Sequence, residues 1–284
     1  QSGNNSYPKF PDRTDCGASS CTYNQEIQNF ANWFQYYRKR HQSLAGASGE
    51  AFDEARSIRS SFFLFNDRKD VTMLDFDTPD TRKNGRRVMG GLYNVKGSGG
   101  TPTRTTLEYI GKQYERTGAS APIQAACQFN AGFIITDGFA TNEGPKVGNV
   151  DGDTSNVYNY QFKPDRADPN TPDAAGEKPE PYQDKHEDTL ADIAMKYYAT
   201  HLRPDLDKGK VPIEENDLSP GANRNKNLHM VTYGLILGLR GFIYGNEDQY
   251  PKENADPYTY PVDWNTLGDP RNFQRGPINI DELW

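Results

Sequence analysis

Apolar residues recur at helical spacing in three stretches of the chain, with short apolar runs between them. The first stretch begins at Thr22, where Gln25 three residues later gives the spacing of a capping box. The positions that follow predict a helix with one buried face: Ile27, Phe30, Phe34, Tyr37, His41 and Leu44. Trp33 and Tyr36 widen this face, which we interpret as core first and partner surface second.

Two apolar runs predict a hairpin further along the chain. Ile58–Phe65 and Val71–Phe76 are strand candidates, and Asn66-Asp67 has turn chemistry. Thr78-Pro79 then gives an N-cap and a first-turn proline for a helix that runs toward Tyr93.

Single helices and single strands alternate in the second half. Thr101-Pro102 and Asp188 begin two helices, and Phe133–Thr136 and Met230–Leu237 are strand candidates. The inward helical positions are Leu107, Ile110, Tyr114, Leu190, Ile193, Ala194 and Tyr197. This alternation predicts an α/β fold with a doubly wound, mostly parallel sheet.

The polar stretches predict how the chain is divided. Residues 1–21 form an irregular leader, residues 22–255 one domain, and residues 256–284 a segment leading toward a following domain. Long polar insertions, rich in Pro, Gly, Asp and Asn, are expected at about 138–187 and 203–226.

Composition narrows the choice of partners. The formal net charge of -7 repels phosphate backbones, so nucleic acid is not an expected partner. No apolar run of about 18 residues is present, so no membrane span is expected. Because the chain has no signal peptide, we expect a mature, truncated or cytosolic chain.

The three cysteines predict one local disulfide. Cys16 and Cys21 lie close together, and a bond between them would suit an oxidising compartment. Cys127 would then be buried and free, or bonded to a cysteine outside this chain. A zinc site is not expected from so few ligands.

The main candidate chemistry lies in two loops at the predicted edge of the sheet. Gly99–Thr103 opens a helix, and Phe133–Gly138 closes a strand. The Thr101 hydroxyl and the Asp137 carboxylate are oxygen donors of the kind a hard divalent cation prefers. Two other interpretations stay open: Thr101 caps its helix, and Asp137 only ends a strand in a turn.

Other polar groups are interpreted as structural. Asp151–Asn156 alternates oxygen donors but lacks the terminal Glu of a calcium loop, so a solvated turn is favoured. His41 and His229 fall near predicted core faces and are expected to be structural. The sequence has no nucleophile elbow, phosphate-binding lysine loop or His-Glu-x-x-His pair, so an enzyme is not expected.

Several blocks of the chain together resemble the PilY family of type IV pilus biogenesis and tip adhesin proteins. They occur in the family's order: Cys21–Arg38, Gly99–Pro102, Thr136–Gly138, Asp188–Tyr198, Leu202–Leu206 and His229–Tyr233. The resemblance implies a von Willebrand factor A-like domain, an extracellular location at the pilus tip or outer cell surface, and roles in pilus assembly and adhesion.

The resemblance also implies a metal-ion-dependent adhesion site built from an Asp-x-Ser-x-Ser loop, a Thr and an Asp. Thr101 matches that Thr and Asp137 that Asp, but no Asp-x-Ser-x-Ser occurs in this sequence. Binding of Mg²⁺ or Ca²⁺ is therefore expected to be weak or absent. A sheet without that strand would expose apolar edges, which we expect another segment to fill.

These observations predict a non-enzymatic adhesion and assembly domain of a type IV pilus tip-associated protein. The expected partners are minor pilins, other pilus tip components and a ligand on a host or abiotic surface. One alternative is a scaffold that docks minor pilins with no metal role. Another is a carbohydrate-binding module that uses its many tyrosines.

Overall fold

The structure is a computed structural model that describes residues 5–17, 19–76, 80, 90–136, 139–142, 144–151, 184–213, 223, 225–237, 241 and 269. The packing divides the chain into two compact units. Unit 1 comprises residues 1–61 and 74–97, and unit 2 comprises residues 62–73 and 98–284. The domain boundaries expected at residues 21 and 255 stay predictions.

Unit 1 contains small two-stranded sheets and the two longest of the described helices. Its first sheet is a hairpin of β1 (Ser6–Pro8) and β2 (Ser20–Thr22), which lies within the leader that was expected to be irregular. Its other elements in the described residues are α1 (Tyr23–Tyr36), α2 (Arg40–Glu54), β3 (Arg59–Ser60), β4 (Leu74–Asp75) and the 3₁₀ helix η1 (Gly90–Asn94). Strands β3 and β4 pair antiparallel, as the predicted hairpin required, but each has only two residues.

The predicted capping box begins α1. The Thr22 N–H donates to Gln25 Oε1 (2.8 Å), and the Gln25 N–H donates to Thr22 Oγ1 (3.4 Å). The single long helix expected after it is wrong, because α1 ends at Tyr36 and α2 begins at Arg40. The Ser43 hydroxyl donates to the Tyr37 carbonyl (2.7 Å), a bond that joins the chain at the end of α1 to the first turn of α2.

The buried face predicted for α1 is also wrong. No residue of α1 is buried, and Phe30 and Trp33 are 59% and 51% exposed. A helical period identifies which face is apolar, but what covers that face depends on distant parts of the chain. Among the described elements, β2 and α2 lie beside α1, and they leave its apolar face largely exposed.

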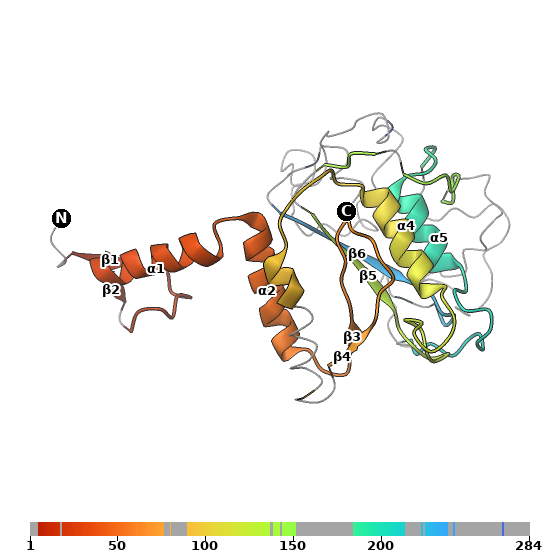
Figure 1. Ribbon diagram of the computed structural model, residues 1–284, viewed down its shortest axis with the longest axis horizontal. Helices are drawn as coiled ribbons and strands as arrows, with labels where there is room; N and C mark the ends of the chain where they lie inside the picture. Colours follow the sequence, from red (N-terminus) through yellow and green to blue (C-terminus); the bar gives the residue numbers. More distant parts are fainter. Residues whose placement is uncertain are drawn as a thin grey trace. The chain divides into compact units, whose positions relative to one another are not determined.

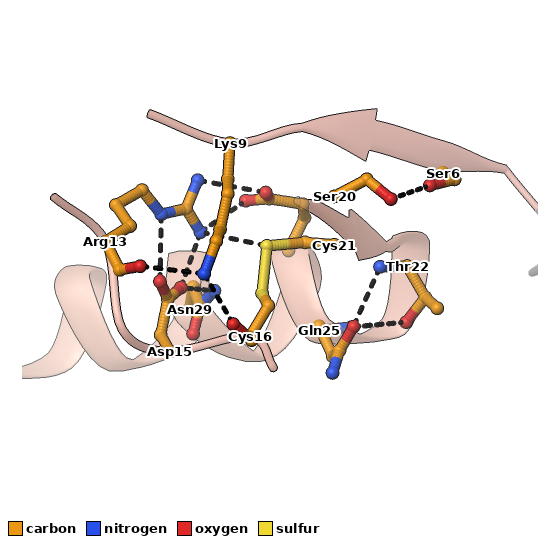
Figure 2. The surroundings of a disulfide bond; sticks show 11 residues. Ser6, Lys9, Arg13, Asp15, Cys16, Ser20, Cys21, Thr22, Gln25 and Asn29 are labelled. Atoms are coloured by element: carbon orange, nitrogen blue, oxygen red, sulfur yellow. Dashed lines mark hydrogen bonds and ion pairs between the residues drawn. A yellow bond between two sulfur atoms is a disulfide. The ribbon is translucent and has the colours of Figure 1, made fainter. Parts of the chain in front are cut away.

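The disulfide predicted between Cys16 and Cys21 is confirmed (Figure 2). Both cysteines are buried, and Arg13 beside them pairs with Asp15 and Glu26. Cys127 is free and exposed, so the interpretation that it is buried is wrong.

Unit 2 builds its core on a parallel strand pair. Strands β5 (Ala131–Thr136) and β6 (Val231–Ile236) run parallel, with Ala131 opposite Val231 and Thr136 opposite Ile236. Helices α4 (Thr103–Tyr114) and α5 (Leu190–Ala199) lie side by side against this pair (Figure 1). The buried side chains between them are apolar: Leu107, Tyr114, Ile123, Ile134, Leu190, Ile193, Tyr197, Leu202, Val211, Leu228 and Met230. The inward helical faces predicted for α4 and α5 are thus confirmed.

The two helices approach closely at a glycine. A Cβ atom on Gly111 of α4 would lie 2.4 Å from Cδ1 of the buried Tyr197 ring on α5. Glycine is therefore needed here for packing, although it is a poor helix former.

The β5–β6 pair also carries apolar side chains on its other face. Phe133 and Tyr233 lie opposite each other with stacked rings, 4.8 Å between centroids, and are 62% and 43% exposed. Leu235 beside them is 49% exposed. The pair is thus apolar on both faces, a pattern typical of sheets covered by helices on both sides.

Some predicted elements fall outside the described residues. They include most of the helix expected from Thr78-Pro79, much of both polar insertions, and nearly all of the segment 256–284. Within the described residues the fold is mixed α/β, and the doubly wound sheet stays a prediction. No described helix combines the length and apolar character needed to cross a bilayer.

Candidate functional site

The loop before α4 is held in a defined conformation. Gly99 has a φ of 82°, a region that glycine enters without strain. The Asn66 side chain donates to the carbonyls of Ser98 (3.0 Å) and Gly100 (2.7 Å). These bonds place Thr101 just before the first turn of α4.

The loop after β5 is hydrogen-bonded to this loop. The Thr101 N–H donates to Thr141 Oγ1 (2.7 Å), and the Thr141 N–H donates to the Thr101 carbonyl (3.1 Å). A Cβ atom on Gly100 would lie 2.6 Å from Thr141 Oγ1, so the approach requires glycine. We call these two segments, residues 99–103 and 139–142, the α4 rim.

The first turn of α4 strengthens the same junction. The buried Arg104 donates from Nη1 to the Asn142 carbonyl (3.1 Å), and Asn142 Nδ2 donates to Thr105 Oγ1 (2.8 Å). Arg104, Thr141 and Asn142 are not among the residues that the sequence predicts for this site. Their signal is weak, since an Arg in a helical first turn and polar residues after a strand are common.

The structure describes one of the two predicted metal ligands and not the other. Thr101 lies in the α4 rim, and Asp137 lies outside the described residues, between Thr136 at the end of β5 and Thr141. The N-cap position of α4 falls on Pro102, without a side-chain cap, so the interpretation of Thr101 as the cap is wrong. The metal site itself stays a prediction.

The rim has an electrostatic preference. The N-terminus of the twelve-residue helix α4 lies at the rim, and its dipole favours negative charge there. A carboxylate, from Asp137 or from a partner, is the group that this position suits.

Compact sets of metal-binding side chains are scarce in the described ranges. Within those ranges, one group of three His, Cys, Asp or Glu residues brings its ligand atoms within 4.8 Å of one another. The group consists of Asp15, Cys16 and Cys21. The two sulfurs are bonded to each other, so they cannot act as thiolate ligands.

A second polar cluster joins the segment 144–151 to the start of α5. Thr189 is the N-cap of α5, and Asp192 completes a capping box with it. Asp192 Oδ1 also accepts from the Val150 N–H (2.6 Å), and burial raises the pKa of Asp192. Burial would also raise the pKa of Asp188, but the N–H groups of Gly148 and Val147 bind its carboxylate and lower that pKa.

Asp151 in this cluster is fully buried. Burial, together with the charges of Asp192 and Asp184, raises its pKa to about 9. The solvated turn interpreted from the sequence is therefore wrong for Asp151, whereas Gly152–Asn156 lies outside the described residues. A lone acidic residue in a polar stretch gives no sequence signal of burial.

His229 is structural, as expected. It is 1% exposed, its Nδ1 lies 2.6 Å from the Asn227 carbonyl, and its Nε2 lies 2.9 Å from Asn223 Nδ2. These partners suit a neutral ring with the proton on Nδ1, and burial lowers the pKa of the ring.

Comparisons with known proteins give one consistent result. The chain is similar to three proteins named "Type IV pilus biogenesis factor PilY1" from Pseudomonas aeruginosa. Identity is 29% over 94% of the chain for strain PAK, 29% over 76% for strain PAO1, and 26% over 78% for strain UCBPP-PA14. No family model and no solved structure matches.

The chain spans 24% of the length of the strain PAK relative and 20% of the other two. These relatives support the resemblance to pilus biogenesis proteins. They do not bear on the von Willebrand factor A-like fold or on metal binding.

Proposed function

We propose that this chain is a non-enzymatic assembly and adhesion domain of a type IV pilus-associated protein, acting with pilus components at the outer cell surface. The pilus role rests on relatives that are named as pilus biogenesis factors. The adhesive role rests on the α4 rim. Its supporting observation is the reciprocal hydrogen bonding between Thr101 and Thr141, four residues after Asp137.

The proposed fold is a doubly wound, von Willebrand factor A-like sheet. The parallel β5–β6 pair, covered on one face by α4 and α5 and apolar on the other, supports this proposal. In such a sheet, ligands collect at the carboxyl ends of the strands. Asp137 directly follows the last residue of β5 at that end.

The proposed mechanism is cation-assisted recognition. Thr101 and Asp137 would supply oxygen ligands to Mg²⁺ or Ca²⁺, and the ion would keep a position open for a carboxylate of the partner. Thr101 directly precedes the start of α4, and Asp137 directly follows β5 in the sequence.

The test is replacement of Asp137 by Ala in the cell that makes this protein. Surface pili are counted, and attachment is measured with Mg²⁺ and after chelation. Asp207→Ala, which removes an exposed carboxylate after α5, is the matched control. We expect normal attachment in the control, and in Asp137→Ala a loss equal to that caused by chelating the wild type. Wild-type attachment by Asp137→Ala at equal protein levels would refute the adhesion site.

One observation favours the scaffold alternative as a second candidate. The apolar face of α1, with Phe30, Trp33 and Phe34 about half exposed, is the kind of surface that protein partners cover. Under this alternative, Phe30→Ser with Trp33→Ser lowers the pilus number, whereas Asp137→Ala leaves it unchanged.

A further inference from the structure

Two segments that are distant in the sequence meet beside the start of α5. Asp151 and Asp184 are the described residues that flank residues 152–183. They lie close together, because Asn149 Nδ2 donates to the Asp184 carbonyl (3.1 Å) and the charge of Asp184 acts on Asp151.

Most carboxylates in this cluster have partners of their own. Asp192 accepts from backbone N–H groups and from a hydroxyl, through both of its oxygens. Asp188 binds two backbone N–H groups through Oδ1, and its Oδ2 lies 3.2 Å from Lys146 Nζ. Asp184 Oδ1 accepts from the His186 N–H (2.6 Å).

Asp151 has no such close partners. It is 0% exposed, and neither of its carboxylate oxygens makes a hydrogen bond of normal geometry, although the backbone N–H groups of Asp184 and Asp151 lie near enough to lower its pKa in part. Asn149 Oδ1 is likewise buried without a partner, although Nδ2 of the same side chain is bonded. Buried polar atoms are nearly always paired, so three such oxygens on residues 149 and 151 need an explanation.

A bound proton explains them only in part. A protonated Asp151 would be neutral and could donate one hydrogen bond, for example to Asn149 Oδ1, but its second oxygen would still lack a donor. A hard cation takes carboxylate and amide oxygens as ligands, so an ion bound between these two side chains would pair with all three oxygens.

We propose that Asp151 and Asn149 bind a calcium ion beside Asp184, and that this ion fastens together the two chain segments that flank residues 152–183. Calcium fits because the donors are carboxylate and amide oxygens, two of the ligand types that it takes in proteins. Zinc fits poorly, because the unpaired donors on residues 149 and 151 are oxygens and not the His and Cys ligands that zinc prefers. This site does not include Thr101 or Asp137, so the calcium proposal can be tested independently of the proposed adhesion site.

In the test, CaCl₂ is titrated into the purified chain after bound metal has been removed with a chelator. Every protein in the comparison carries Asp137→Ala, which removes the proposed ligand at the α4 rim. Binding heat and the thermal midpoint are measured for this parent, for added Asp151→Asn and for added Asp207→Asn. We expect calcium to raise the midpoint of the parent and of the Asp207→Asn control, and to leave Asp151→Asn unchanged. Asn149→Ala, which keeps the acidic residue, should bind calcium more weakly and provides a second variant if Asp151→Asn does not fold.

Three outcomes would overturn the proposal. One is a parent that shows neither binding heat nor a midpoint shift with CaCl₂ up to about 10 mM, beyond the weakest calcium modules. Another is an unchanged calcium response in both Asp151→Asn and Asn149→Ala. The third is tighter binding of Zn²⁺ than of Ca²⁺ that is lost in His186→Gln, because that result would assign the site to a different metal and donor set.

Discussion

Replacing Asp192 by Ala should destabilise unit 2 more than any other single loss of a side-chain cap. The Asp192 carboxylate accepts from the N–H groups of Val150 (2.6 Å) and Thr189 (2.9 Å), and from the Thr189 hydroxyl (2.8 Å). It therefore joins two chain segments as well as capping a helix.

The magnitude follows from the groups that lose their partner. Two buried N–H donors left without an acceptor cost about 1–3 kcal/mol each. Burial raises the pKa of Asp192, so its charge is itself unfavourable there, and removing the charge offsets part of the loss. The expected fall in the free energy of unfolding is roughly 2–4 kcal/mol.

Thr189→Ala is the matched comparison, because it removes the other half of the same capping box. Its expected cost is about 1 kcal/mol, that of an ordinary N-cap. Urea denaturation followed by circular dichroism gives the stability of each variant. Hydrogen exchange reports locally, and protection of the Val150 amide should be lost in Asp192→Ala and kept in Thr189→Ala.

The reasoning is refuted if Asp192→Ala unfolds within about 0.5 kcal/mol of the wild type and the Val150 amide keeps its protection. That result would mean that the carboxylate makes no net contribution at this junction.

Three further predictions test other parts of the structure. Gly111→Ala should lower the free energy of unfolding, measured by urea denaturation, by about 1–3 kcal/mol, because its methyl group would lie 2.4 Å from the Tyr197 ring. Adding Tyr197→Leu should restore part of the loss. Equal stability of the wild type and Gly111→Ala would contradict this. Burial lowers the pKa of His229, so as the pH falls below about 6.5 the unfolded chain binds a proton before the folded chain does. The stability of the wild type should therefore fall in this range relative to that of His229→Gln. Parallel pH profiles of the thermal midpoint for the two proteins would contradict this. Replacing Cys16 and Cys21 by Ser should lower the free energy of unfolding by about 2 kcal/mol, because the disulfide closes a short loop. It should also remove hydrogen-exchange protection from the β1–β2 hairpin. Unchanged protection there would argue against a structural role for the disulfide.

Local signals predicted the parts of this chain whose structure depends on nearby residues. The Thr22–Gln25 capping box, the Cys16–Cys21 disulfide and the inward faces of α4 and α5 depend on spacings of a few residues, and all are confirmed. The exposed face of α1 could not be predicted, because its pattern is that of a buried helix and the difference lies in what the rest of the chain covers.

In the candidate sites, too, local sequence signals identified some residues, while distant contacts determine how those residues are placed. Spacing and chain order identified Thr101, but the hydrogen bonds that place it come from Thr141 and Asn66, far away in the sequence. The sequence favours a solvated turn at Asp151–Asn156 because the segment lacks the terminal Glu of a calcium loop, yet packing beside the start of α5 buries Asp151. Burial of a lone charge is set by tertiary contacts, which no local pattern encodes.

The central claim is that Thr101 and Asp137 lie within reach of one ion. The most direct measurement is cross-linking of cysteines placed at both positions in a Cys127→Ser chain, using the shortest bismaleimide and mass spectrometry. The pair Thr101→Cys with Thr141→Cys is the positive control, because those residues are hydrogen-bonded to each other, and Thr101→Cys with Asp207→Cys is the negative control. We expect the Thr101–Asp137 pair to cross-link as readily as the positive control. A yield no higher than that of the negative control would contradict the claim.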